Sequence, residues 1–120
     1  MKVKGRFDHF NINVTDLDKS IKFYETALGL HESHRKEASD GSFVLVYMAD
    51  DHSNFFLELT WLRDHTQPYE LGENESHLCL RVEGDYDEVR KFHKEMGCVC
   101  FENTAMGLYF INDPDDYWIE

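Results

Sequence analysis

Histidines and glutamates recur at matching places in two halves of the sequence. His9 opens the segment HFNINVTDLDKSIKFYETALGL, and His77 opens HLCLRVEGDYDEVRKFHKEMGC, which aligns with the first segment without a gap. Glu58 and Glu120 lie in the last apolar segment of each half. Two imidazoles and two carboxylates suit a borderline divalent cation such as Ni²⁺, Co²⁺, Zn²⁺ or Mn²⁺. Four protein ligands on an octahedral cation leave two positions for water or substrate, so this set predicts a catalytic metal site.

Each of these side chains also has an ordinary structural explanation when it is taken alone. A single histidine or glutamate on a strand is more often a solvent-facing or hydrogen-bonded residue than a metal ligand. The recurrence of both residue types within a repeat is what favours a metal site. The other five histidines show no such symmetry and are expected at the surface: His31, His34, His52, His65 and His93.

The elements that position these residues follow one plan in both halves. Alternating polar and apolar residues predict a first strand over residues 7–14 and, in the second half, over 77–82. A capped helix follows each strand, with Thr15 or Asp16 as the first cap and Gly29 as the stop, and with the second helix over residues 85–96. The remaining strands are expected over residues 30–36, 42–49 and 54–61, and over residues 99–102, 107–112 and 117–120.

This plan predicts an α+β fold made of two βαβββ modules within a single domain. Module one covers about residues 5–61 and module two about residues 76–120, and a polar linker containing Pro68 and Gly72 joins them over about residues 62–75. A module that is present only twice is not a solenoid, because a solenoid needs three or more stacked units. The sequence therefore indicates a duplicated module with one candidate ligand pair in each copy.

Composition limits the classes of function. The 120 residues carry a formal net charge of −12, which argues against nucleic-acid binding and disfavours anionic membrane surfaces. No apolar run reaches the length of a membrane span, and the first residues, MKVKGRF, lack the apolar stretch of a signal peptide, so a soluble cytoplasmic protein is expected. Cys79, Cys98 and Cys100 are expected to be small buried residues in a reducing compartment, with the last two facing the same way in a strand.

At these residues the sequence resembles the vicinal-oxygen-chelate superfamily and, within it, glyoxalase I (lactoylglutathione lyase). The resemblance covers nearly the whole chain and rests on FDHFNINVTDLDKSIKFYETALGL, FFLELTW, YELGENESHLCLRV and INDPDDYWIE. It implies curved mixed sheets in the two modules. It also implies a homodimer in which a metal site takes His9 and Glu58 from one subunit and His77 and Glu120 from the other.

The activity implied by the resemblance is a lyase that isomerises the hemithioacetal of methylglyoxal and a thiol into a 2-hydroxyacyl thioester. The ligand order His9, Glu58, His77, Glu120 is that of glyoxalase I, and it implies Glu120 as the main base and Glu58 as a ligand and second candidate base. The short chain resembles the nickel or cobalt class, so Ni²⁺ is expected first, with Co²⁺ or Zn²⁺ as alternatives. Another metal enzyme of the superfamily (an epimerase or a thiol transferase) and a non-enzymatic ligand-sequestering protein stay open as other functions.

Three positions depart from the pattern of glyoxalase I. Relatives that bind the carboxylates of glutathione typically carry arginine at the place of Asn13 and asparagine at the place of Leu62. These departures disfavour glutathione as the thiol and leave another small thiol, or a different chelating substrate, open. Asp116 stands where relatives usually have glycine, in a turn that needs left-handed backbone, which aspartate adopts at a small cost.

Overall fold

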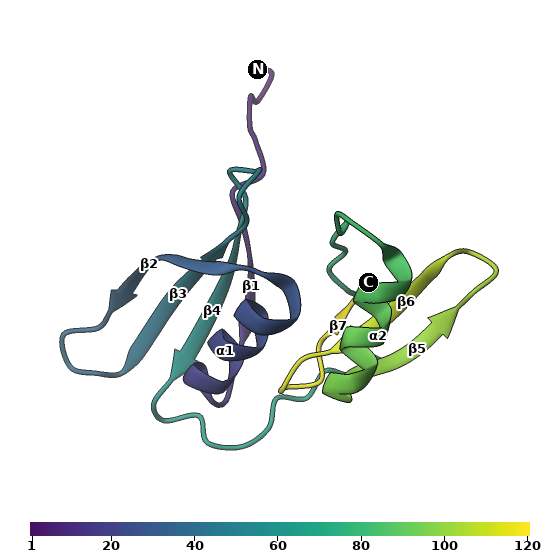
Figure 1. Cartoon of the computed structure of the whole chain (residues 1–120). Coiled ribbons are helices and arrows are strands. Elements are labelled where there is room, and N and C mark those ends of the chain that lie inside the picture. The colour runs from purple at the N-terminus through teal and green to yellow at the C-terminus, as the bar shows by residue number, and fades with distance from the viewer. The chain divides into compact units, whose positions relative to one another are not determined.

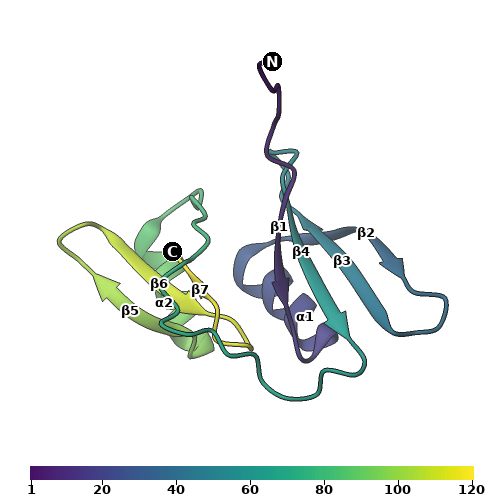
Figure 2. The same ribbon diagram turned by 180° about the vertical axis from the view of Figure 1, so that it is seen from behind.

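The computed structural model describes all 120 residues, which divide into two compact units, Met1–Tyr69 and Glu70–Glu120. Each unit holds one helix and one sheet, as the ribbon shows from two sides (Figure 1 and Figure 2). Neither helix has the length and apolar character needed to cross a bilayer. The α+β class predicted from the sequence is confirmed, whereas the union of both units in a single domain stays a prediction.

The first unit is built on a four-stranded mixed sheet with the order β1-β4-β3-β2. β1 pairs in parallel with β4, and the other two pairings are antiparallel. The parallel pairing brings the first and the last strand of the unit side by side at one edge of the sheet. The strands are β1 (His9–Asn13), β2 (His31–Glu37), β3 (Phe43–Ala49) and β4 (Phe56–Leu62).

Helix α1 (Leu17–Leu28) lies on one face of this sheet and contacts β2 and β4 (Figure 1). Asp16 caps the helix by accepting a hydrogen bond from the backbone N–H of Lys19 at 3.1 Å, and Gly29 ends it with a left-handed φ of 67°. On the helix side of the sheet, Val46 and Leu59 have no exposed surface. The core of the unit therefore lies under α1, and the opposite face of the sheet carries the polar residues.

The second unit has a three-stranded antiparallel sheet with the order β5-β6-β7. Asp85 caps helix α2 by accepting the backbone N–H of Glu88 at 3.0 Å, and Gly97 ends it at φ 75°. Its apolar core is small, with Ile111 and Ile119 at 2% exposure each. The elements are α2 (Tyr86–Met96), β5 (Val99–Asn103), β6 (Leu108–Asn112) and β7 (Trp118–Ile119).

The strand expected over residues 77–82 does not form a regular ladder. Leu78 makes an isolated parallel bridge, and the only backbone bonds of this segment to β7 run through Glu120: its N–H donates to Leu78 O at 2.8 Å, and Leu80 N–H donates to its carbonyl at 2.9 Å. A strand is defined by its partner, and β7 has only two residues. The parallel pairing between this segment and β7 is therefore limited to the single bridge at Leu78.

The two units nevertheless share the pairing that matters for the candidate site. In the first unit, the residue after His9 pairs in parallel with the residue before Glu58. In the second unit, the residue after His77 pairs in parallel with the residue before Glu120. The duplication inferred from the sequence therefore extends to the register that places each histidine beside a glutamate.

The turn before β7 has the geometry expected from the sequence. Asp116 adopts a left-handed φ of 72°. Its backbone N–H donates to Asp113 O at 3.0 Å, and its carboxylate accepts Asn112 Nδ2 at 3.0 Å. These local bonds support a conformation that side-chain-bearing residues adopt at some cost. The prediction for this position is confirmed.

The expectation that His93 lies at the surface is wrong. His93 is 2% exposed in the second unit, and its Nδ1 atom lies 2.8 Å from the hydroxyl of Tyr109 on β6. It occupies the side of α2 that faces the sheet, where a polar ring can be buried because a hydrogen-bond partner is present. His93 is thus a structural residue.

The expectation for the cysteines holds for one of the three. Cys98 is buried, but Cys79 and Cys100 are exposed, and all three are free thiols. The register of β5 shifts between Val99 and Phe101, which breaks the alternation of side chains. Cys98 lies just before β5 and Cys100 within it, so the condition of the prediction, that both lie in one regular strand, is not met.

Candidate metal centre

His9 and Glu58 lie together in the first unit, on the sheet face opposite α1. The His9 Nε2 atom is 3.7 Å from Glu58 Oε2. The Glu58 side chain is 11% exposed because it sits in the middle of β4, between β1 and β3, whereas the His9 side chain is 39% exposed. The predicted pair is present, with its carboxylate inside the sheet and its imidazole open to solvent.

His77 and Glu120 form the corresponding pair in the second unit. The His77 Nε2 atom is 3.4 Å from Glu120 Oε1, and the two side chains are 37% and 28% exposed. Both backbone groups of Glu120 are bonded to the segment that follows His77. These bonds hold the glutamate beside the histidine even though no regular strand forms there.

The donor set fits a divalent cation. Ligand atoms that share one cation lie roughly 3 to 3.5 Å apart at the bond lengths of nitrogen and oxygen ligands. The two nitrogen–oxygen separations, 3.7 Å and 3.4 Å, are close to that spacing. No group of three or more His, Cys, Asp or Glu side chains within the chain is arranged to hold a metal ion, so each unit offers a pair.

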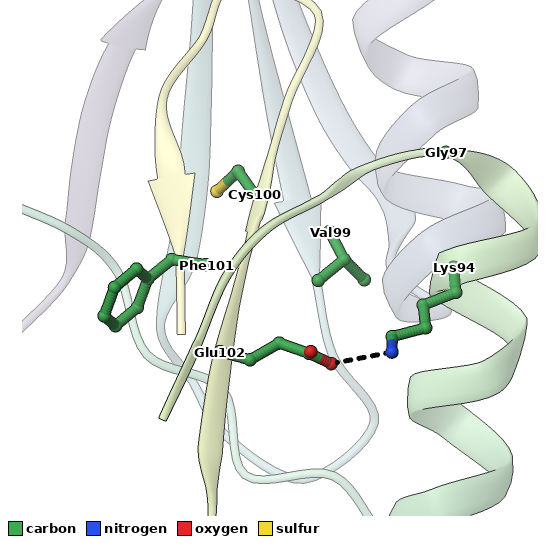
Figure 3. Close-up of a pocket in the computed structure, with 6 residues that line it drawn as sticks. All are labelled: Lys94, Gly97, Val99, Cys100, Phe101 and Glu102. Atoms are coloured by element: carbon green, nitrogen blue, oxygen red, sulfur yellow. Dashed lines mark ion pairs between the residues drawn. The ribbon is translucent and has the colours of Figure 1, made fainter. Parts of the chain in front are cut away.

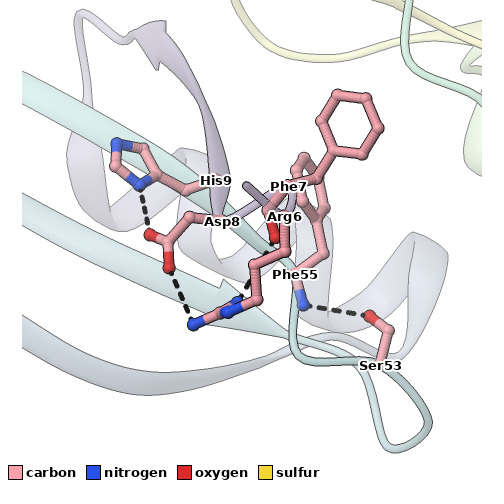
Figure 4. A network of polar contacts seen from close by, with 6 residues as sticks. All are labelled: Arg6, Phe7, Asp8, His9, Ser53 and Phe55. Atoms are coloured by element: carbon pink, nitrogen blue, oxygen red, sulfur yellow. Dashed lines mark hydrogen bonds and ion pairs between the residues drawn. The ribbon is translucent and has the colours of Figure 1, made fainter. Parts of the chain in front are cut away.

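Asp8 fixes the orientation of the His9 ring (Figure 4). His9 Nδ1 donates to Asp8 Oδ2 at 2.7 Å, and Arg6 Nη2 lies 3.3 Å from the other carboxylate oxygen. The hydrogen bond from His9 lowers the pKa of Asp8. Because Nδ1 is engaged, Nε2 is the nitrogen that faces Glu58. A carboxylate on the far nitrogen of a ligating histidine fixes its tautomer and orientation.

Tyr47 is a second residue of the site that sequence reasoning missed. It pairs with Glu58 across β3 and β4 and forms a side-chain hydrogen bond with the Glu58 carboxylate. This bond, together with burial and the nearby negative charge, raises the pKa of Tyr47 to about 12. Its ring is stacked on His34 at a centroid distance of 4.3 Å and meets the edge of His9 at 5.7 Å. The phenol is therefore firmly placed beside the carboxylate.

Cys79 contacts the candidate glutamate of the second unit. Its Sγ atom donates to Glu120 Oε2 at 3.1 Å, while the other carboxylate oxygen faces His77. Burial, followed by the hydrogen bond and charge of Glu120, raises the pKa of the Cys79 thiol. The sequence indicates this proximity, because Cys79 lies two residues after His77 and therefore on the same face of an extended chain.

A row of uncharged polar groups continues from His9 along the same sheet face. Asn11 Nδ2 donates to Asn13 Oδ1 at 2.9 Å, and the Thr60 hydroxyl donates to Asn11 Oδ1. Asn13 Nδ2 donates to the Tyr69 hydroxyl at 3.4 Å. Leu62, the last residue of β4, adds no polar group. We call Asn11, Asn13, Thr60 and Tyr69 the neutral row.

A shallow cavity of about 360 Å³ lies in the second unit at the junction of α2 and β5 (Figure 3). Its wall includes an ion pair between Lys94 Nζ and Glu102 Oε1 at 3.1 Å. None of the four candidate ligands lines it, so it is not the predicted site. The lining residues are Lys94, Gly97, Val99, Cys100, Phe101 and Glu102.

Comparison with known proteins places this architecture in a family. A family model described as "Glyoxalase/Bleomycin resistance protein/Dioxygenase superfamily" matches residues 6–120. The chain is 32% identical over 122 residues to a lactoylglutathione lyase of Neisseria meningitidis, covering 96% of this chain and 88% of that protein. It is 35% identical over 121 residues to a probable lactoylglutathione lyase of Synechocystis, covering 93% and 90%.

Solved structures show the same relationship. The trypanothione-dependent glyoxalase I of Leishmania major is similar with a TM-score of 0.83 and 31% sequence identity, covering 97% of this chain and 84% of that one. These relatives confirm the resemblance to glyoxalase I that the motifs indicated, along with the fold class. The chain belongs to the Glyoxalase/Bleomycin resistance protein/Dioxygenase superfamily.

Proposed function

We propose that the chain is a metal-dependent lyase that converts the hemithioacetal of methylglyoxal and a small thiol into a 2-hydroxyacyl thioester. The observation that carries this proposal is the histidine–glutamate pair in each unit, with nitrogen–oxygen distances of 3.7 Å and 3.4 Å. The relatives named lactoylglutathione lyase and glyoxalase I support the same reaction.

The proposed ligands are His9, Glu58, His77 and Glu120, and the proposed cation is Ni²⁺, with Co²⁺ or Zn²⁺ as alternatives. Imidazole and carboxylate donors suit all three ions. When bound, a divalent cation supplies Lewis-acid stabilisation of the negative charge that develops on the two neighbouring oxygens of the substrate. Asp8 supports this role by keeping His9 Nε2 directed at Glu58.

Glu120 is the proposed base. The carbon of the hemithioacetal that carries the sulfur loses a proton, and the neighbouring carbonyl carbon gains one, so the reaction is an isomerisation with no net loss of atoms. A carboxylate oxygen of Glu120 takes the proton from the first carbon and returns it to the second. The hydroxyl proton on the first carbon moves to the oxygen of the second, so the first becomes the thioester carbonyl and the second the alcohol. The Glu120 side chain is 28% exposed and accessible to a substrate, whereas Glu58 at 11% suits a fixed ligand and second candidate base.

The proposed thiol differs from glutathione in its charges. The neutral row lies on the sheet face shared with His9 and Glu58, and its four side chains are themselves uncharged. A thiol with free carboxylates finds no cation in that row, and the net charge of −12 opposes it further. Relatives of this fold are themselves named for two different thiols, glutathione and trypanothione.

The proposed assembly is a homodimer with shared sites. His9 and Glu58 of one subunit would combine with His77 and Glu120 of the partner subunit, which supplies the four ligands that neither unit offers alone. Large apolar side chains that remain exposed, Phe10 at 46% and Phe101 at 49%, support burial against a second copy. A cytoplasmic location is proposed because all three cysteines are free thiols.

The test is turnover with a panel of thiols. Protein loaded in turn with Ni²⁺, Co²⁺ or Zn²⁺ is mixed with methylglyoxal and with glutathione, cysteine or trypanothione, and thioester formation is followed. We expect turnover with at least one thiol, with glutathione not the best, and a loss of about 10²- to 10⁴-fold in Glu120→Gln. Protein that binds metal stoichiometrically but turns over no adduct would contradict the proposal.

A further inference from the structure

Each candidate carboxylate has a donor beside it in addition to the histidine that it faces, and the two donors differ in chemistry. The phenol of Tyr47, directly opposite Glu58 across β3 and β4, is the donor beside Glu58. Glu120 is bonded to the thiol of Cys79, with Sγ 3.1 Å from Oε2. The two donors come from different places in the repeat, since Tyr47 lies on β3 and Cys79 on the segment that follows His77. Each nevertheless lies beside a carboxylate that faces an imidazole.

The two donors differ in strength. A sulfur atom 3.1 Å from a carboxylate oxygen must carry a proton, since two negative charges at that distance would repel each other. A thiol is a weak donor, whereas a phenol O–H forms a strong, charge-assisted bond to a carboxylate. The phenol therefore restrains Glu58 more than the thiol restrains Glu120.

The surroundings of the two donors reinforce this difference. Tyr47 is 7% exposed, and its ring is held by stacking on His34 and by the edge of Phe56. Cys79 is exposed, on a segment whose pairing with β7 stops after one step. One donor is fixed by its packing, and the other has freedom to follow the carboxylate that it contacts.

We propose that Tyr47 and Cys79 are positioning residues, the phenol holding Glu58 as a fixed ligand and the weaker thiol orienting Glu120 while leaving it free to reach the substrate. This inference rests on the proposed function, because it assigns the unequal roles of the two carboxylates to their donors. It also makes Cys79 a thiol that acts without becoming a ligand or a nucleophile.

Ni²⁺ affinity, measured by titration calorimetry of the metal-free full chain, tests the inference without turnover. We expect Tyr47→Phe to weaken binding by about 10- to 100-fold, the usual effect of losing a partner of a ligand, and Cys79→Ala by only about threefold. Cys79→Ser should recover the affinity lost in Cys79→Ala, because the hydroxyl is also a donor. Cys100→Ala and Tyr86→Phe are matched controls outside the site and should bind as wild type does.

Kinetics with the best thiol of the panel give a second readout. We expect Cys79→Ala to lower kcat by about tenfold with KM within about twofold, because an orienting bond acts on the reacting carboxylate and not on substrate binding. Cys79→Ser should restore most of kcat. The Co²⁺-loaded wild type should show no sulfur-to-metal charge-transfer absorption, and such a band, absent in Cys79→Ser, would overturn the positioning role.

The outcomes separate the inference from the proposed function. Wild-type protein that turns over no adduct contradicts the reaction, and the order of Ni²⁺ affinities then decides the inference alone. An active wild type with Cys79→Ala unchanged in both affinity and kcat overturns the inference and leaves the reaction standing. The inference is also wrong if Cys79→Ser behaves as Cys79→Ala does, or if Tyr47→Phe binds Ni²⁺ no more weakly than Cys79→Ala.

Discussion

The hydrogen bond between Asp8 and His9 shows how one side chain can orient a candidate metal ligand. Asp8→Ala removes the acceptor of His9 Nδ1, so the ring can turn and its tautomer is no longer fixed. We expect Ni²⁺ affinity to fall by about tenfold or more, with Asp8→Asn retaining part of it because the amide oxygen still accepts. Titration calorimetry measures both. Asp18→Ala, in the first turn of α1, is the control, and equal affinities in Asp8→Ala and wild type would remove Asp8 from the site.

If the neutral row binds the thiol as proposed, Asn13 should decide which thiol charge it accepts. Asn13→Arg places a cation among groups that are otherwise uncharged, on the face that carries His9 and Glu58. We expect the ratio of kcat/KM for glutathione over a carboxylate-free thiol to rise about tenfold, since a hydrogen bond to a charged group contributes about 1.5 kcal/mol. Asn13→Gln is the neutral control. An unchanged ratio in the arginine variant would mean that the row does not contact the thiol.

The four candidate ligands could be predicted from the sequence, whereas the residues that orient them could not. His9, Glu58, His77 and Glu120 stand out because they recur at matching places in a repeat. Tyr47 becomes visible only once the register of β3 against β4 is known, because that register puts it opposite Glu58. The hydrogen-bond partner of a side chain depends on strand register and on its rotamer, and neither can be read from the residue type alone.

At the scale of elements, the helices were predictable because their signals are local. Asp16 and Gly29 bound α1, and Asp85 and Gly97 bound α2, with caps that form within a few residues. The strand over residues 77–82 was predicted wrongly, because alternating polar and apolar residues do not show whether a neighbouring strand is available for pairing. Whether a ladder forms depends on the partner, and β7 is too short to continue it.

The turn between β3 and β4 depends on the Asp50 carboxylate. It accepts the backbone N–H groups of His52 at 2.7 Å and Ser53 at 2.6 Å, and the Ser53 hydroxyl at 2.8 Å. The backbone bond from Ser53, then that from His52, lowers the pKa of Asp50. These bonds favour the ionised carboxylate in the folded state. Their contribution is present above the ordinary aspartate pKa of about 3.9 and is lost as pH falls through the lower folded value.

We therefore expect Asp50→Ala to lower the free energy of unfolding by about 1 kcal/mol at neutral pH. The difference in the free energy of unfolding between wild type and variant should become smaller as pH falls below about 4. Urea unfolding at pH 7 and at pH 3 measures it. Asp51→Ala, at a side chain 80% exposed, is the control and should change stability little at either pH. A gap that is as large at pH 3 as at pH 7 would rule out the carboxylate bonds as its cause.

At the scale of the whole molecule, the duplication is the feature that the sequence predicts best. The units Met1–Tyr69 and Glu70–Glu120 each end on a strand that runs parallel to the unit's first segment, and each brings one histidine to one glutamate. The proposed four-ligand site would be complete only when two such halves combine. The number of subunits that share a site is a property of the assembly, which a single chain's local patterns do not encode.

Mixed dimers test whether the halves combine across subunits. Glu58→Gln and Glu120→Gln are co-expressed with different tags, and the dimer that carries both tags is purified. If each site takes His9 and Glu58 from one subunit and His77 and Glu120 from the partner subunit, one site of the mixed dimer has both substitutions and the other has neither. We then expect about half the wild-type kcat per dimer and one tightly bound Ni²⁺, because a two-fold dimer holds two equivalent sites. Each variant alone should be inactive in its own homodimer. If all four ligands come from one chain, every site in the mixed dimer keeps one substitution, and the mixed dimer stays as inactive as its parents.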